Sequence, residues 1–439
     1  MPGLFTVSGP AGRSVTAAWR RAGAGLAVAL VAALGVATAA GPAPAAHADQ
    51  VRDLEYWLND YGFNQAWNTT RGDGVTVAVI DTGVDGTVAE LRGAVVGGKD
   101  VSGIGTSNGQ TPVGEENEHG TLVASLLAGR GTGAGTGLIG VAPEADILSV
   151  SVAFGSSGAE LSNDDQIAEG IRWAVDNGAD VINMSLTRNT LTWPTSWDDA
   201  FMYAFENDVV VVAAAGNRAG GTDEVGAPAT IPGVLTVAGV DRSKGASFDA
   251  SSQGITIAVA APSEYLVGVA PGGGYVQWNG TSAAAPIVSG LVALVRSAYP
   301  KLDAAGVINR IIETANPNGH SVPSPIYGNG LIDAAAAVSG SVSRDESATP
   351  AQLLQEWITL HRRAETEPDP DTPPATVAPI VPVEDPALPE QQTATAWLPN
   401  PLTVTYVSLP LAVLVGFGIL VTLFGIGATR HFKRIRHQL

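Results

Sequence analysis

Short apolar runs recur through the middle of the chain and alternate with segments of helical spacing. Several runs are apolar throughout, which is typical of strands buried on both faces of a parallel sheet. Helical spacing is clearest over Asp164–Asn177 and Ala284–Ala298. The alternation predicts βαβ units and a doubly wound, mostly parallel α/β sheet, whose functional sites lie at the carboxyl ends of strands. The expected strands are Val75–Ile80, Ile147–Val152, Val181–Met184, Val209–Ala214, Val234–Val240 and Ile255–Ala260.

The two ends of the chain predict export and membrane anchoring. Arginines at 13, 20 and 21 precede an apolar run and a small-residue site ending at Ala48, which is the pattern of a cleaved signal peptide. An uncleaved anchor is the alternative. Near the other end, residues 406–428 carry no charge and are long enough to span a bilayer. The basic cluster at residues 430–436 then puts the C-terminus in the cytoplasm.

A proline-rich stretch separates the expected globular domain from the membrane. Repeated Pro, Asp and Glu from about residue 365 predict an extended, semi-rigid stalk. Before it, Leu354, Trp357 and Ile358 follow a helical spacing. This spacing is compatible with a short helix docked on the domain, and equally with a transient helix in a flexible arm.

Composition excludes several classes of protein. The chain has no cysteine, so disulfides, thiol catalysis, zinc–thiolate sites and iron–sulfur clusters are ruled out. It has 42 acidic and 23 basic residues and a formal net charge of −19. Because phosphate binding needs a basic face, this balance argues against nucleic acid as a partner. We expect no cofactor and no metal ion.

Polar residues stand where a doubly wound sheet should have its site. Asp81 directly follows the expected strand at 75–80, His119 begins another expected helix, and Ser282 precedes the helix at 284–298. Taken singly, each has an ordinary structural explanation: a turn aspartate, a structural histidine and a serine that caps a helix. Together they are a carboxylate, an imidazole and a hydroxyl, the groups of nucleophilic catalysis.

Four short motifs carry a family resemblance. They lie at residues 79–85 around Asp81, 119–124 from His119, 213–217 ending in Asn217, and 280–286 around Ser282. In this order they make the chain resemble subtilisin-like serine proteases over about residues 56–338. The resemblance implies Ser282 as nucleophile, His119 as general base and Asp81 as its orienting carboxylate. Asn217 matches the residue that stabilises the oxyanion.

The resemblance also implies where substrate binds. An extended peptide would lie between a wall at Phe154 and Gly155 and a second wall at Ser185, Leu186 and Thr187. Members of the family usually have two glycines after the Ser-Leu pair, and this chain has residues 187–189, Thr-Arg-Asn, instead. This departure predicts a narrower or partly obstructed cleft.

The order of segments is most like that of a mycosin, a membrane-anchored subtilase of type VII secretion systems. That resemblance implies a peptide or protein substrate, secretion-complex subunits as partners, a catalytic domain outside the cell membrane and a cytoplasmic C-terminus. A tethered surface protease without a secretion role and a non-catalytic scaffold are the alternatives. The expected division is signal peptide 1–48, N-terminal segment 49–73, peptidase domain 74–340, proline-rich linker 341–402, transmembrane helix 403–429 and basic tail 430–439.

Overall fold

The computed structural model describes residues 48–155, 158–221, 223–342 and 348–362. The expected signal peptide up to residue 47, the linker beyond residue 362, the membrane helix and the basic tail lie outside the described residues.

A seven-stranded sheet forms the centre of the described part of the chain, in the order β2-β3-β1-β4-β5-β6-β7. Every neighbouring pair in it is parallel. The doubly wound α/β fold predicted from the apolar runs is therefore confirmed, and each of the expected strands is present. The strands are β1 Thr76–Asp81, β2 Val95–Asp100, β3 Asp146–Ser151, β4 Val181–Met184, β5 Val210–Ala214, β6 Leu235–Val240 and β7 Ile257–Pro262.

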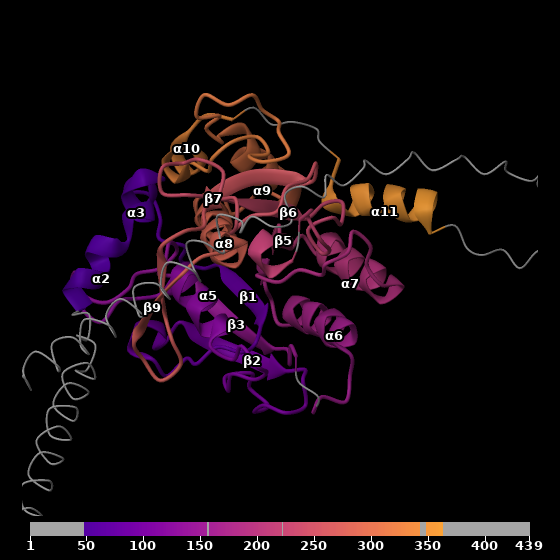
Figure 1. Cartoon of the computed structure of the whole chain (residues 1–439), viewed down its shortest axis with the longest axis horizontal. Coiled ribbons are helices and arrows are strands. Elements are labelled where there is room, and N and C mark those ends of the chain that lie inside the picture. Colours follow the sequence, from indigo (N-terminus) through magenta and orange to yellow (C-terminus); the bar gives the residue numbers. More distant parts are fainter. Residues whose placement is uncertain (1–47, 156–157, 222, 343–347, 363–439) are drawn as a thin grey trace, which may run out of the picture. The chain divides into compact units, whose positions relative to one another are not determined.

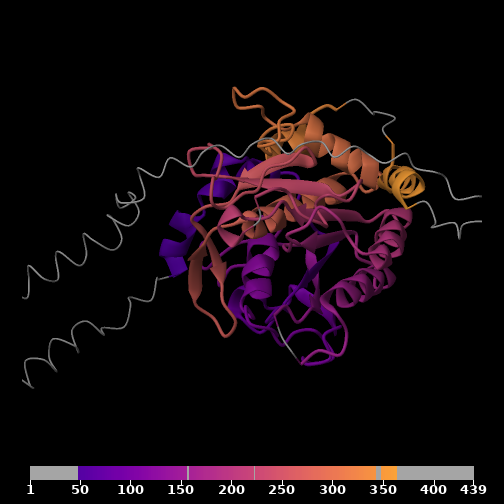
Figure 2. The ribbon, with the colours of Figure 1, turned by 45° about the vertical axis from the view of Figure 1, so that its right-hand side comes forward.

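Helices cover both faces of this sheet. α5 packs with α8, and α6 packs with α7 on the opposite side (Figure 1, Figure 2). Most of the strand residues between them are fully buried, which explains why the runs are apolar throughout. The helices of the core are α5 His119–Ala128, α6 Asn163–Asp176, α7 Thr195–Glu206, α8 Thr281–Ala298, α9 Ala304–Glu313 and α10 Ala334–Ser339, with short 3₁₀ turns η1 Ala89–Leu91 and η2 Arg218–Gly220.

Helix α8 is the central helix of the core. It packs against β4, β5, β6 and β7. Among the described residues it is the one helix long and apolar enough to cross a membrane, yet 78% of its most apolar window is buried inside the protein. Its apolar character therefore reflects burial in the core, and it is distinct from the span expected at residues 406–428.

Some elements were not predicted from the apolar pattern. β2 is an edge strand that contains Gly97 and Gly98 and is only partly buried. A separate antiparallel hairpin is formed by β8, Leu266–Val269, and β9, Tyr275–Trp278. β7 begins at Ile257 rather than at Ile255, whose side chain is 96% exposed.

The N-terminal segment is part of the core. It forms the short helices α2 Ala48–Leu54, α3 Tyr56–Asp60 and α4 Phe63–Ala66. The side chains of Trp57 and Phe63 are fully buried. Glu55 is also buried and accepts a hydrogen bond of 2.8 Å from the backbone N–H of Ile139. Burial raises the pKa of Glu55 to about 8, against the opposing effects of this hydrogen bond and of Arg52.

A further helix, α11 Pro350–His361, lies within the stretch that the sequence assigned to a linker. Of the two alternatives left open, the structure has the docked helix, which packs on α7 (Figure 1). Leu354 is fully buried, and the rings of Trp357 and Trp193 lie 4.2 Å apart between centroids. At the end of α11, Arg362 donates 2.8 Å hydrogen bonds to Asp198 Oδ2 and to the Trp193 carbonyl oxygen.

The contacts of Arg362 predict that this residue contributes to the stability of the fold. Arg362→Ala leaves the buried Asp198 carboxylate without its cation, so we expect the free energy of unfolding to fall by about 1–3 kcal/mol. Chemical denaturation of the purified full chain measures this change. The control is Arg172→Ala, which removes an exposed arginine of α6 and should change stability by no more than about 0.5 kcal/mol. Equal stability of the two variants would show that the Arg362 contacts contribute nothing.

Candidate active site

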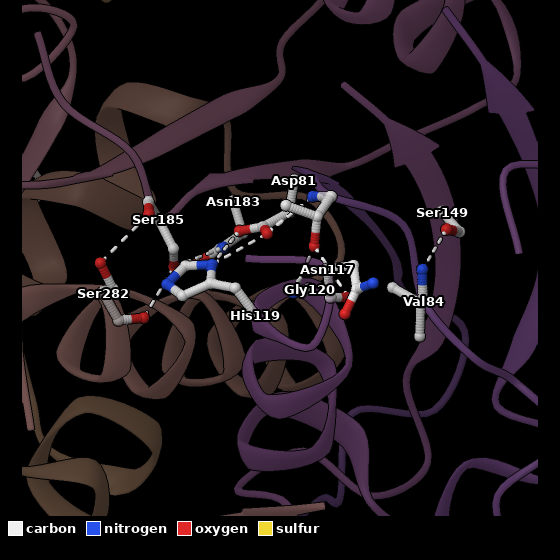
Figure 3. Close-up of polar contacts among 10 residues, drawn as sticks. Asp81, Val84, Asn117, His119, Gly120, Ser149, Asn183, Ser185 and Ser282 are labelled. Carbon is white, nitrogen blue, oxygen red and sulfur yellow. Dashed lines mark hydrogen bonds and ion pairs between the residues drawn. The ribbon is translucent and has the colours of Figure 1, made fainter. Parts of the chain in front are cut away.

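The three residues singled out by the sequence lie together at the carboxyl edge of the sheet. Asp81 is the last residue of β1, His119 is the first residue of α5, and Ser282 is the second residue of α8. Figure 3 shows the His119 ring between Asp81 and Ser282. The site therefore joins one strand end and two helix N-termini that are far apart in the sequence, as parallel-sheet topology favours.

Asp81 and His119 form a close pair. His119 Nδ1 lies 2.9 Å from Asp81 Oδ1 and 3.0 Å from Oδ2. The Asp81 side chain is only 1% exposed, and its Oδ1 also accepts a 2.7 Å hydrogen bond from the backbone N–H of Thr82. A glycine is required next to the histidine, because a Cβ at residue 120 would overlap the carbonyl oxygen of Gly83. This close approach brings α5 against the end of β1.

The charges around His119 favour its protonated form. Burial of the ring opposes protonation, but the Asp81 carboxylate acts the other way through its charge and its hydrogen bond. Glu116 and Glu118 add to the effect of Asp81. The net result is a His119 pKa above its ordinary value.

The start of α8 fixes the position of Ser282. Gly280 has a φ of 144°, a conformation that L side chains rarely adopt, and the helix begins at the next residue. Pro286 lies inside the helix and has no N–H to donate to the carbonyl oxygen of Ser282, four residues earlier. That oxygen instead accepts a 2.8 Å hydrogen bond from Ser185 Oγ. Ser282 Oγ in turn donates to the Ser185 carbonyl oxygen at 3.1 Å.

A chain of buried polar groups extends this contact into the core. Ser289 lies about two turns further along α8 than Ser282, and its Oγ donates to Asn183 Oδ1 at 2.8 Å. Asn183 Nδ2 donates to Ser185 Oγ at 3.0 Å. This series of hydrogen bonds fixes α8 relative to β4 along the helix axis and thereby positions Ser282. Neither Asn183 nor Ser289 was predicted; the available signal was one polar residue inside an otherwise apolar strand or helix.

Asn217 lies just beyond the end of β5, beside the first turn of α8. Its Oδ1 accepts hydrogen bonds from the backbone N–H of Thr281 at 2.8 Å and from Thr281 Oγ1 at 2.9 Å. With the oxygen held in this way, the Nδ2 amide is the end of the side chain left to meet a substrate. Thr281 was not predicted, although it lies within the motif around Ser282.

A cavity of about 570 Å³ opens beside these residues. The Trp278 ring lies edge-on to the His119 ring, with 5.5 Å between centroids. Acidic residues form another part of the wall. The lining residues are Glu115, Glu116, Asn117, Glu118, His119, Leu122, Asn217, Val276, Trp278, Asn279 and Ser282.

The substrate-binding residues expected from the sequence lie outside this cavity. Ser185 is beside Ser282, and Leu186 and Thr187 follow it as half-buried residues. Phe154 and Gly155 lie beyond the end of β3. None of these five lines the cavity described above, which is bounded instead by the segment before His119 and by the β9 strand. Trp278 and the glutamates were not predicted as parts of the site.

Comparison with known proteins identifies the class. The model of the subtilase family (Peptidase_S8) matches residues 72–330. Subtilisin DY of Bacillus licheniformis is 38% identical over 270 residues, which are 61% of this chain and 92% of that protein. The chain belongs to the subtilase family, and it is a serine endopeptidase of the subtilisin type.

Solved structures place it near the mycosins within that family. MycP1 from Mycobacterium smegmatis has a TM-score of 0.57 and 32% identity, over 66% of this chain and 86% of that one. The MycP3 protease from the type VII (ESX-3) secretion system has a TM-score of 0.57 and 33% identity, over 69% of this chain and 90% of that one. The resemblance to subtilisin-like proteases and to mycosins drawn from the sequence is thus confirmed.

The charges near His119 predict how peptidase activity depends on pH. If His119 is the general base expected from the sequence, it must be neutral to accept a proton, so kcat/KM should rise as the pH increases through the His119 pKa. Replacing Glu116 and Glu118 by Gln removes two charges that favour the imidazolium, and therefore lowers this pKa. We expect the acidic limb of the kcat/KM profile to move to lower pH in the double variant. Glu356→Gln on α11 is the control and should leave the limb in place. A limb that does not move in the double variant would contradict the assignment.

Proposed function

We propose that the chain hydrolyses peptide bonds with Asp81, His119 and Ser282 as its catalytic triad. The observation that carries the proposal is the 2.9 Å Asp81–His119 pair in the same cleft as a serine held at a helix N-terminus. Ser282 Oγ attacks the carbonyl carbon, and His119 Nε2 takes its proton and returns it to the leaving amine. Asp81 keeps the other proton on Nδ1 and stabilises the imidazolium.

Asn217 completes the proposed chemistry. The charge that develops on the carbonyl oxygen would be stabilised by hydrogen bonds from Asn217 Nδ2 and from the Ser282 backbone N–H. Two contacts with Thr281 hold the Asn217 side chain before substrate arrives, so little reorganisation is needed during reaction. We propose no metal ion or cofactor.

The nucleophile is tested by substitution. Ser282→Ala removes the attacking oxygen and should abolish labelling by a fluorophosphonate probe and nearly all peptide hydrolysis. Asn217→Ala should retain labelling and lower kcat by about 10²–10³-fold, because one donor to the oxyanion is lost. The matched control is Ser297→Ala at the far end of the same helix, which should behave as wild type. Equal labelling of wild type and Ser282→Ala would contradict the assignment of Ser282 as the nucleophile.

We propose that the peptidase acts outside the cell membrane and is tethered to it. The support lies in the sequence: a signal-like segment at 1–48, an uncharged stretch within 403–429 and a basic tail at 430–439. A peptidase unit within 74–340, preceded by the segment 49–73, would then reach the membrane through residues 341–402. Because α11 occupies Pro350–His361 within that stretch, we place the proposed stalk after Arg362.

We further propose that the protein supports a type VII secretion system, both by limited proteolysis and structurally. The similarity to MycP3, a protease from such a system, and to MycP1 favours this assignment over a surface protease with no secretion role. Tethering by one helix raises the local concentration of the peptidase beside membrane partners without any new contact. Secretion-complex subunits are therefore the proposed partners, in addition to the substrate.

The structural role is tested by complementation. Deleting the gene should block secretion through the system, and Ser282→Ala should restore most of it. A variant without residues 406–439 should keep peptidase activity and fail to restore secretion. External protease added to intact protoplasts should remove the catalytic domain, which checks its location. If Ser282→Ala folds and localises normally but behaves like the deletion, the role is catalytic alone.

A further inference from the structure

The geometry points to a peptidase that accepts only small side chains, glycine or alanine, immediately before the scissile bond. This inference rests on the proposed function of Ser282, His119 and Asn217. It concerns a different part of the cleft, the space on the far side of Ser282 from His119.

The direction in which a substrate must lie follows from the roles of the site. His119 returns a proton to the leaving amine, so the leaving part of the peptide occupies the open cavity that His119 and Trp278 line. The acyl part therefore extends the other way, past Asn217 and the Ser185 backbone. Ser185 follows β4 and Asn217 follows β5, and these strands are parallel neighbours. The side chain before the scissile bond must enter the gap between the two strand ends.

Beside the end of β4, main chain fills the space that this side chain would need. The backbone N–H of Arg188 donates to the Ala227 carbonyl oxygen at 2.7 Å, and the N–H of Ala227 donates to the Thr190 carbonyl oxygen at 2.9 Å. These bonds join the segment that follows β4 to the segment around Gly226. A Cβ at residue 226 would overlap the carbonyl oxygen of Arg188 and lie 2.7 Å from Thr187 Oγ1. The space beside Gly226 is thus filled by residues 187 and 188.

The closing segment is also held from outside. The Arg188 side chain makes an ion pair with Asp164 on α6, and its guanidinium lies over the Trp197 ring of α7 at 5.6 Å. Thr187 Oγ1 donates to the Arg188 carbonyl oxygen at 3.1 Å. A large side chain would have to break the backbone bonds to Ala227 and these outer contacts together. The sequence already predicted an obstructed cleft from residues 187–189; the structure identifies the subsite that they obstruct.

The test compares peptides that differ only at the residue before the scissile bond. Fluorogenic libraries with Gly, Ala, Leu or Phe fixed there, and mixed residues elsewhere, are hydrolysed by the full chain in detergent. We expect kcat/KM for Ala to exceed that for Phe by about 10²-fold or more, the order that a tight pocket gives. Peptidyl aldehydes ending in Ala or Phe, competing with the fluorophosphonate probe, make the same comparison when turnover is slow.

A variant separates the subsite from the chemistry. Thr187→Gly combined with Arg188→Gly removes the outer contacts and the Thr187 side chain. We expect cleavage after Leu and Phe to rise by about 10-fold or more relative to cleavage after Ala, a change of the size that pocket contacts can produce. Arg172→Gly, which removes an exposed arginine of α6 instead, should keep the wild-type preference.

The outcomes are distinguishable. Probe labelling of wild type together with equal cleavage or inhibition by the Ala and Phe compounds overturns the subsite inference and leaves the proposed function standing. Absence of labelling and of cleavage with every peptide overturns both. A double-glycine variant that folds, labels and still prefers Ala as strongly as wild type shows that residues 187 and 188 do not set the preference.

Discussion

Burial of α8 is the constraint on which the site depends. The helix is enclosed by the sheet on one side and by α5, α9 and α10 around it, and from Ala283 to Val295 its residues are buried. A helix in this position cannot slide or turn without opening cavities in a close-packed interior. Its N-terminus therefore presents residue 282 at a fixed point beside β4 and β5. The geometry of the proposed triad therefore follows from the packing of the core, at whose edge its polar residues lie.

Packing alone would leave the first turn of α8 free to fray. Hydrogen bonds to its backbone hold this turn in place. Pro286 removes the N–H that would have held the Ser282 carbonyl oxygen. Left unpaired in a half-buried position, that oxygen would cost free energy. Ser185 supplies the missing hydrogen bond, and Asn183 and Ser289 hold Ser185 in turn. The interruption of the helix is thus what couples the proposed nucleophile to the wall of the cleft.

Sequence reasoning succeeded where one physical effect dominates a segment. β4 was predicted to the residue because double burial makes its run apolar, and Asp81 stood out as a carboxylate at the end of such a run. It failed where burial is partial: β2 at the sheet edge tolerates Gly98, whose hydrogen is all that fits against the Asn108 carbonyl oxygen. It also missed the pairing of Asn183 with Ser289, because a lone polar residue in an apolar run does not reveal a partner 106 residues away.

The wall of the cleft and helix α11 both contact one element, α7. Its Trp197 lies under the Arg188 guanidinium, and its Asp198 accepts hydrogen bonds from both Trp193 and Arg362. The segment from Ser185 to Trp193 therefore runs between the backbone around Gly226 and a helix that also holds α11. Loosening α11 removes a contact from the far end of the same segment that closes the acyl side of the cleft. The proposed small-residue subsite and α11 therefore contact the same helix, α7, and the same segment from Ser185 to Trp193.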